Sequence, residues 1–151
     1  MTSHPMFPLA GMVAVTAVSA CHAAAPTEPP RGPAPSATPP APGAIRRSLI
    51  ARRPATGLAG WETRLYLIEY PPGASAPPHT HPAVGVGLVL DGRFESAFGD
   101  EPTVQVEAGQ GFVDQADTPH RVFRNLSPDH PLRFVIAYTL RAQDEPLHVL
   151  P

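Results

Sequence analysis

Three features that would point to common classes of protein are scarce or missing in this sequence. Its 151 residues include one cysteine, which excludes an internal disulfide and a cysteine-rich zinc site. The formal net charge is −2, so the basic face expected of a nucleic-acid-binding protein is not indicated. No stretch of a dozen residues repeats apolar side chains at the helical period. With 42% hydrophobic residues, the chain is predicted to fold as one domain with a core of strands and no nucleic-acid partner.

The sequence also has no apolar run of the roughly 20 residues that span a membrane comfortably. Residues 6–20, MFPLAGMVAVTAVSA, are instead typical of the hydrophobic region of a secretory signal peptide. This run leads into Val18-Ser19-Ala20-Cys21, which resembles the lipobox of bacterial lipoproteins. The resemblance implies a signal peptide over residues 1–20, a lipid anchor on Cys21 and a place in the cell envelope or periplasm. The alternative is an ordinary signal peptide cut at residues 23–25, with Cys21 discarded.

Proline is abundant, with 22 residues, and it is concentrated after the predicted signal peptide. Residues 21–43 cannot bury an apolar face, because prolines interrupt them at positions 26, 29, 30, 33, 35, 39, 40 and 42. The segment is therefore predicted to be an extended, disordered Pro/Ala-rich linker. It would tether a folded domain of residues 44–151 to the membrane if Cys21 carries lipid. Otherwise it is a disordered N-terminus left by export.

From about residue 44, short β-rich segments alternate with turn signals. Strands are predicted over residues 61–70, 84–90, 93–98, 103–107, 112–114, 120–124 and 132–140, with a short last strand or a loose tail at 147–151. Asp91-Gly92 indicates a tight hairpin, and residues 99–102 indicate a second turn. This spacing of strands and turns predicts a β-sandwich or β-barrel.

A basic cluster lies where the linker meets the predicted domain. Its members are Arg46, Arg47, Arg52 and Arg53. We interpret the cluster as a solvated, charged first strand. The alternative is a contact with anionic lipid headgroups.

Three histidines form the most informative pattern in the chain. His79 and His81 are two residues apart, and a strand turns such residues to the same face. His120, from a later strand, could complete a metal site with them. Neutral imidazole is a common ligand of Zn, Cu, Fe and Ni, and three protein ligands with an open position are typical of catalytic sites. The alternative is that these are surface or core histidines without a ligand role.

Residues 46–142 resemble a cupin, a small β-barrel of the jelly-roll type. The first cupin motif matches at Gly73, His79, His81 and Gly92, and the second matches at Gly109, His120 and Asn125. The resemblance implies an all-β fold, a single jelly-roll barrel, and one divalent ion (Fe, Mn, Ni, Zn or Cu) held by the three histidines. It also implies a homodimer, since cupins are often dimers.

Two departures from the cupin pattern affect the predicted site. The glutamate of the first motif falls at Gly85, which has no side chain, and Asn125 comes one residue later than usual. Asp114, six residues before His120, is the candidate for a fourth ligand or for a partner of the ligands. The alternative for Asp114 is an exposed turn residue.

Five further side chains are on predicted strands that could line a cavity or belong to the core. They are Arg64, Tyr66, Phe94, Phe123 and Tyr138, which we predict to bind a small-molecule ligand. The sequence thus supports a metal-dependent enzyme, such as a dioxygenase, that acts on a small organic molecule. The alternatives are a module that binds a small molecule or stores a metal without turnover, and a decayed cupin that serves a structural role. No general base is evident near the histidines, which favours the binding module.

Overall fold

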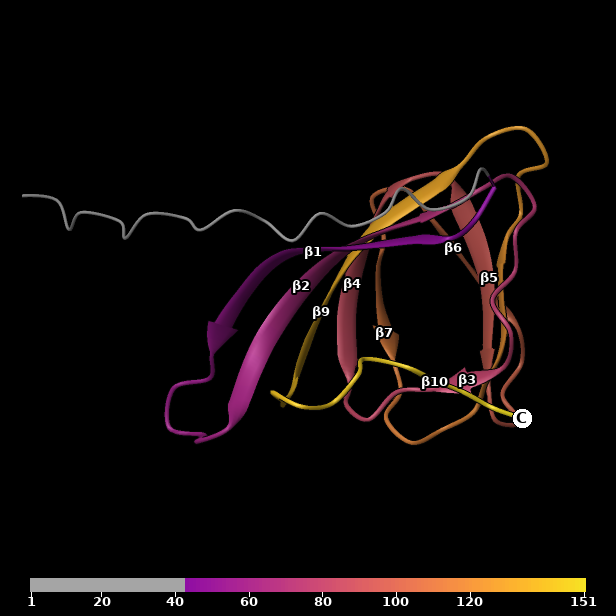
Figure 1. Cartoon of the computed structure of the whole chain (residues 1–151). Coiled ribbons are helices and arrows are strands. Elements are labelled where there is room, and N and C mark those ends of the chain that lie inside the picture. Colours follow the sequence, from indigo (N-terminus) through magenta and orange to yellow (C-terminus); the bar gives the residue numbers. More distant parts are fainter. Residues whose placement is uncertain (1–42) are drawn as a thin grey trace, which may run out of the picture. The chain divides into compact units, whose positions relative to one another are not determined.

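A computed structural model describes residues 43–151 of the chain (Figure 1). The predicted signal peptide, the lipidated Cys21 and nearly all of the linker lie outside the described residues, and they stay predictions. No helix within residues 43–151 is long and apolar enough to cross a membrane.

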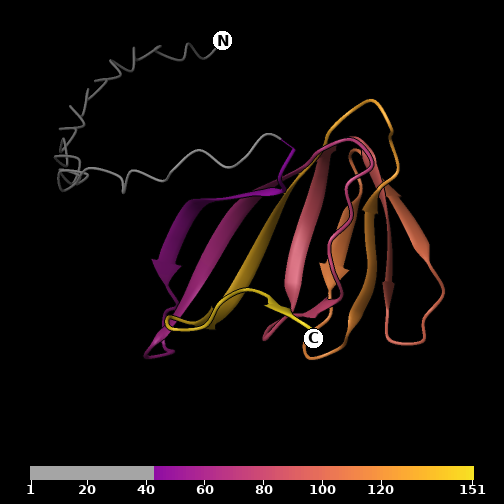
Figure 2. The ribbon, with the colours of Figure 1, turned by 45° about the vertical axis from the view of Figure 1, so that its right-hand side comes forward.

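The described residues form two five-stranded sheets, in the orders β1-β2-β9-β4-β7 and β10-β3-β8-β5-β6. The strands are β1 (Arg46–Pro54), β2 (Trp61–Tyr70), β3 (His79–Thr80), β4 (Gly85–Asp91), β5 (Arg93–Phe98), β6 (Val104–Glu107), β7 (Gly111–Asp114), β8 (His120–Asn125), β9 (Leu132–Arg141) and β10 (His148–Val149). Figures 1 and 2 show the two sheets facing each other across a shared interior. The predicted all-β jelly-roll fold is confirmed, and the last residues form the short strand rather than the loose tail.

The Asp91-Gly92 turn was predicted to close a tight hairpin, and this prediction was wrong. β4 pairs with β7 and β9 in one sheet, whereas β5 pairs with β6 and β8 in the other. Gly92 has a φ of +83°, so the turn chemistry is as expected, but the chain uses the turn to pass between sheets. A turn dipeptide fixes local backbone direction only, whereas the pairing partner depends on strands far away in the sequence. The predicted turn at residues 99–102 does join a paired hairpin, β5 and β6.

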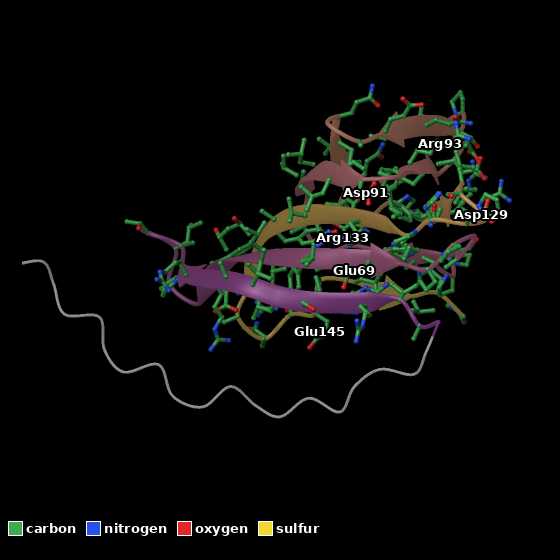
Figure 3. All side chains as sticks on the ribbon, turned by 90° about the horizontal axis from the view of Figure 1, so that it is seen from above. Glu69, Asp91, Arg93, Asp129, Arg133 and Glu145 are labelled. Atoms are coloured by element: carbon green, nitrogen blue, oxygen red, sulfur yellow. The ribbon has the colours of Figure 1, made fainter. Side chains whose placement is uncertain are left out.

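The first strand is exposed along its whole length, in agreement with the interpretation of the basic cluster as a solvated strand. The outer surface of its sheet also carries a charged pair. Glu69 on β2 and Arg133 on β9 are register partners with their Oε1 and Nε atoms 3.4 Å apart (Figure 3). Such an exposed pair contributes only about 0–1 kcal/mol, so the fold must be stabilised from within.

The interior is filled by side chains that alternate along the strands. On β9, Leu132, Phe134, Ile136, Tyr138 and Leu140 are buried in turn. These meet an aromatic cluster from the opposite sheet, in which the rings of Phe94 and Phe123 stack with centroids 4.4 Å apart. Each large apolar side chain so buried stabilises the fold by about 1.5–3 kcal/mol. The core leaves one part of the interior to polar side chains.

Candidate metal centre

The two sheet segments that carry the three histidines are hydrogen-bonded neighbours. His79 begins β3 and His120 begins β8, and the two residues are opposite each other in the β3–β8 pair. His81 follows β3 and bridges to Ala116. The ring centroids of His79 are 4.8 Å from those of His81 and 4.9 Å from those of His120. All three residues are buried, and their ligand nitrogens lie within 4.8 Å of one another.

Backbone carbonyls fix the orientation of two of the rings. His79 Nδ1 is 2.8 Å from the carbonyl oxygen of Pro77, and His81 Nδ1 is 2.8 Å from that of Pro146. A carbonyl only accepts hydrogen bonds, so each Nδ1 carries the proton and each Nε2 keeps its lone pair. This arrangement is common behind metal-ligating histidines, because it fixes the tautomer and raises the basicity of the ligand nitrogen.

The third ring is held by different contacts. His120 Nε2 is 2.7 Å from Ser96 Oγ, and the ring stacks on Phe98 with centroids 3.9 Å apart. Its Nδ1 is buried without a hydrogen-bond partner, as is His81 Nε2. Buried polar atoms are normally satisfied, because an unmade hydrogen bond costs free energy. Two orphaned nitrogens in one histidine cluster therefore suit a bound cation, and the residues present fit a divalent metal.

Burial also sets the protonation state of the cluster. It lowers the pKa of His79 and of His81 below the ordinary value of 6.5. It lowers the pKa of His120 to about 3. All three imidazoles are therefore neutral at pH 7, which is the form that binds a metal ion.

Asp114 lies beside this cluster, and the alternative of an exposed turn residue was wrong. Asp114 is 5% exposed, and Tyr138 donates its hydroxyl to Asp114 Oδ2 over 2.5 Å. The same oxygen is 3.4 Å from His81 Nε2. Burial raises the pKa of Asp114 to about 6. A carboxyl group therefore lies beside the histidines, at the residue that the sequence offered as a fourth ligand or a partner of the ligands.

A cavity opens next to the three histidines, with about 40 Å³ of free volume for water-sized groups. Of the five side chains predicted to line it, Tyr66, Phe123 and Tyr138 do so. The prediction was wrong for Arg64 and Phe94. Arg64 donates to the carbonyl oxygens of Ala142 and Asp144 and pairs with Glu62, while Phe94 belongs to the apolar core.

Sequence reasoning missed Arg47 as a cavity residue. Arg47 was assigned to the solvated basic cluster, and it is exposed, but it also lines the cavity. It pairs with Ile68 on β2, another cavity residue. Burial lowers the pKa of His81, and the positive charge of Arg47 lowers it further. The alternation of β1 could have singled out Arg47 only if its register with β2 had been known.

These features define a class of protein, a small β-barrel with a buried three-histidine cluster beside a cavity. The family model described as "Cupin domain" matches residues 66–138, and the described domain has the fold of a small cupin. Among curated proteins, none matches this sequence significantly.

Solved structures share the fold at low sequence identity. One is an uncharacterized conserved protein with a double-stranded β-helix domain from Klebsiella pneumoniae, with a TM-score of 0.56 and 18% identity, over 75% of this chain and 90% of that one. A cupin-like protein from Thermotoga maritima has a TM-score of 0.55 and 18% identity, over 70% and 75%. An oxalate oxidase in complex with the substrate analogue glycolate has a TM-score of 0.50 and 22% identity, over 59% and 46%.

Proposed function

We propose that this protein binds one divalent metal ion through His79, His81 and His120 and is a metal-dependent enzyme acting on a small anionic organic molecule. The observation that carries the proposal is the pair of orphaned nitrogens, His81 Nε2 and His120 Nδ1, buried within one cluster. Imidazole ligands suit Fe, Ni, Zn and Cu, and a nearby carboxylate extends the set to Mn. When bound, such an ion supplies Lewis-acid or redox chemistry at its open positions.

The charges around the cavity favour an anion as the substrate. Three neutral imidazoles do not cancel the charge of a divalent ion, and Arg47 adds a further positive charge at the exposed side of the cavity. An Arg guanidinium matches a carboxylate with paired N–H donors. The small free volume favours a compact molecule. An oxalate oxidase with bound glycolate has the same fold, so the fold accommodates small carboxylates in at least one enzyme.

The remaining residues of the cavity would orient the substrate and limit its contact with water. Tyr66 and Tyr138 are packed edge to face with centroids 6.5 Å apart, on neighbouring strands that line the cavity. Phe123 and Ile136 supply apolar walls. Export and a lipid anchor on Cys21 would place this chemistry in the cell envelope, where we expect the protein to form a homodimer.

The metal content of the purified protein tests the proposal. We expect close to one ion per chain after metal loading, and less than about a tenth of an ion in His81→Ala, because removing one of three ligands opens the site. His130→Ala is the matched control, since His130 is exposed and outside the cluster. Wild-type protein without metal under loading conditions would contradict the proposal.

Binding of glycolate to the metal-loaded protein tests the substrate class. We expect Arg47→Ala to weaken it about tenfold, equivalent to about 1.4 kcal/mol. Arg53→Ala is the matched control, because Arg53 is on the same strand but is not among the cavity residues. Equal weakening by both variants would remove the specific role of Arg47. Glycolate bound without turnover of any small carboxylate or enediol would favour the non-catalytic binding module instead.

A further inference from the structure

We propose that Asp114 is a carboxylate ligand of the metal ion, that Tyr138 holds it in place, and that Gly85 is required because the ring of Tyr138 occupies the space of a side chain there. This inference rests on the proposed metal site. It assigns the carboxylate of the site to β7, one strand away from the position at which the cupin motif would have carried it.

The three residues form one row across three neighbouring strands. Gly85 on β4 is the register partner of Asp114 on β7 and of Tyr138 on β9. Directly opposed residues of paired strands point to the same face of a sheet. Gly85, Asp114 and Tyr138 are all buried, so this face is the interior. The row therefore faces the histidines of the opposite sheet.

The middle position of the row has no room for a side chain. A Cβ atom at Gly85 would be 2.4 Å from Tyr138 Cε1, 2.8 Å from Tyr138 Cζ and 2.9 Å from Ile136 Cδ1. The ring of Tyr138 cannot easily move away, because it is 4% exposed and stacks on His81 with centroids 5.3 Å apart. A carboxylate for the metal must therefore come from another position, and the adjacent member of the row is Asp114.

The contacts of Asp114 suit a bound cation. The Tyr138 hydroxyl donates a hydrogen bond to Asp114 Oδ2, and that oxygen is 3.4 Å from His81 Nε2. His81 Nδ1 donates to the Pro146 carbonyl, so His81 Nε2 is an acceptor in the neutral ring. Two buried acceptors thus face each other with no donor between them. A metal ion bound by both would convert this repulsion into attraction.

Tyr138 is a positioning residue in this arrangement rather than a ligand. Its hydroxyl group donates its one hydrogen bond to Asp114 Oδ2. The hydroxyl oxygen lies 3.2 Å from His81 Nδ1, which is a hydrogen-bond donor. The hydroxyl thus connects the carboxylate to the ring that carries the facing ligand nitrogen. Both groups are fixed before the metal arrives, which lowers the entropy lost on binding.

Titration of the metal-free full-length protein with Co²⁺, followed by visible absorption, tests the proposal. Asp114→Asn keeps the shape of the side chain and can still accept the Tyr138 hydrogen bond. We expect it to weaken Co²⁺ binding about 10- to 100-fold and to change the position and intensity of the Co²⁺ bands. Tyr138→Phe keeps the ring against Gly85 and His81 but loses the hydroxyl, so we expect a smaller weakening of about tenfold.

The matched control is Asp100→Asn, since Asp100 is exposed in the turn after β5, and it should leave both affinity and spectrum unchanged. Circular dichroism of each metal-free variant establishes that it is folded. Wild-type affinity and bands in Asp114→Asn would overturn this inference while leaving the three-histidine site intact. Failure of the wild-type protein itself to bind Co²⁺ would instead overturn the proposed function.

Discussion

The interior of the barrel has two ends that are built from the same strands but differ in chemistry. On β9, Leu132 is fully buried in the apolar core, whereas Tyr138 on the same face donates a hydrogen bond to Asp114. On β7, Phe112 packs against the core, and Asp114 two residues later lies beside the histidines. Inward alternation alone therefore decides which residues are buried. Whether a buried position serves packing or chemistry is decided by where along the strand it falls.

Two glycines in β4, one at each end, leave space for an aromatic ring. A Cβ atom at Gly87 would be 2.4 Å from Phe112 Cζ, just as one at Gly85 would be 2.4 Å from Tyr138 Cε1. Each glycine makes room for an aromatic ring from a neighbouring strand. At the core end the ring fills apolar space, and at the metal end it holds a carboxylate.

The two ends also contribute to stability with opposite sign. The core end gains from apolar burial, whereas the metal end contains two orphaned nitrogens and a carboxyl group whose pKa is raised by burial. Unpaired buried polar groups destabilise a fold, so the core end must offset the metal end in the metal-free protein. Metal binding would remove this penalty.

The largest effect is expected when the core end alone is damaged. Phe94→Ala deletes a ring that is 1% exposed and stacked on Phe123, and we expect the free energy of unfolding to fall by about 3–5 kcal/mol. Urea unfolding of the metal-free protein measures this loss. The molecules that remain folded should still bind one metal ion, because Phe94 does not line the cavity. Val86→Ala, at a position 63% exposed, should change stability by less than about 0.5 kcal/mol.

Gly87→Ala tests whether a glycine in β4 is needed to leave space for an aromatic ring, at a position where no metal ligand is involved. The added methyl group would meet Phe112 Cζ at 2.4 Å and the Val135 carbonyl oxygen at 2.9 Å, and a backbone atom cannot move aside easily. We expect a loss of about 1–3 kcal/mol in thermal or urea unfolding. Gly111→Ala on the neighbouring strand is the control, since its nearest atom would be 3.6 Å away, an ordinary contact. Equal stability of the two variants would mean that Phe112 repacks freely.

A smaller change is expected in how the stability of the metal-free protein depends on pH. Burial lowers the pKa of His120 from 6.5 to about 3. The contribution of the neutral ring to the free energy of unfolding is therefore present above pH 6.5 and is lost as the pH falls toward 3. Between pH 7 and pH 5 this loss is about 2 kcal/mol, and the lowered pKa values of His79 and His81 add to it.

Asp114 opposes this trend. Its pKa is raised from 3.8 to about 6, so the protein loses the destabilising effect of the buried carboxylate on acidification. This raises the free energy of unfolding by about 1 kcal/mol between pH 7 and pH 5. We therefore expect the free energy of unfolding to fall by about 1 kcal/mol or more between pH 7 and pH 5, and to fall more steeply in Asp114→Asn. Urea unfolding at each pH measures both. Stability that rises on acidification would contradict the histidine assignment.

Several elements could be predicted because their signals are local. The segments 61–70 and 93–98 were predicted with their observed bounds, since β-branched and aromatic residues end there at turn residues. The motif glycines Gly73 and Gly109 both have positive φ, which explains why the pattern needs glycine at these turns. Asn125 of the second motif holds a loop, donating to the carbonyls of Pro71 and His130.

Other features depend on contacts that sequence spacing does not contain. The separation of β4 and β5 into different sheets, the burial of Asp114 and the position of Arg47 at the cavity all follow from pairings with distant strands. Arg64 illustrates the same limit, because its partners are backbone carbonyls near the end of β9 rather than a cavity.

The strand-rich fold and the three histidines could be predicted from the amino-acid sequence, because two-residue alternation and turn chemistry act between near neighbours. The row that a glycine, an aspartate and a tyrosine from three strands form opposite those histidines became visible only in the folded protein. Register between strands is set by packing of the whole interior, so no single segment of the chain specifies it.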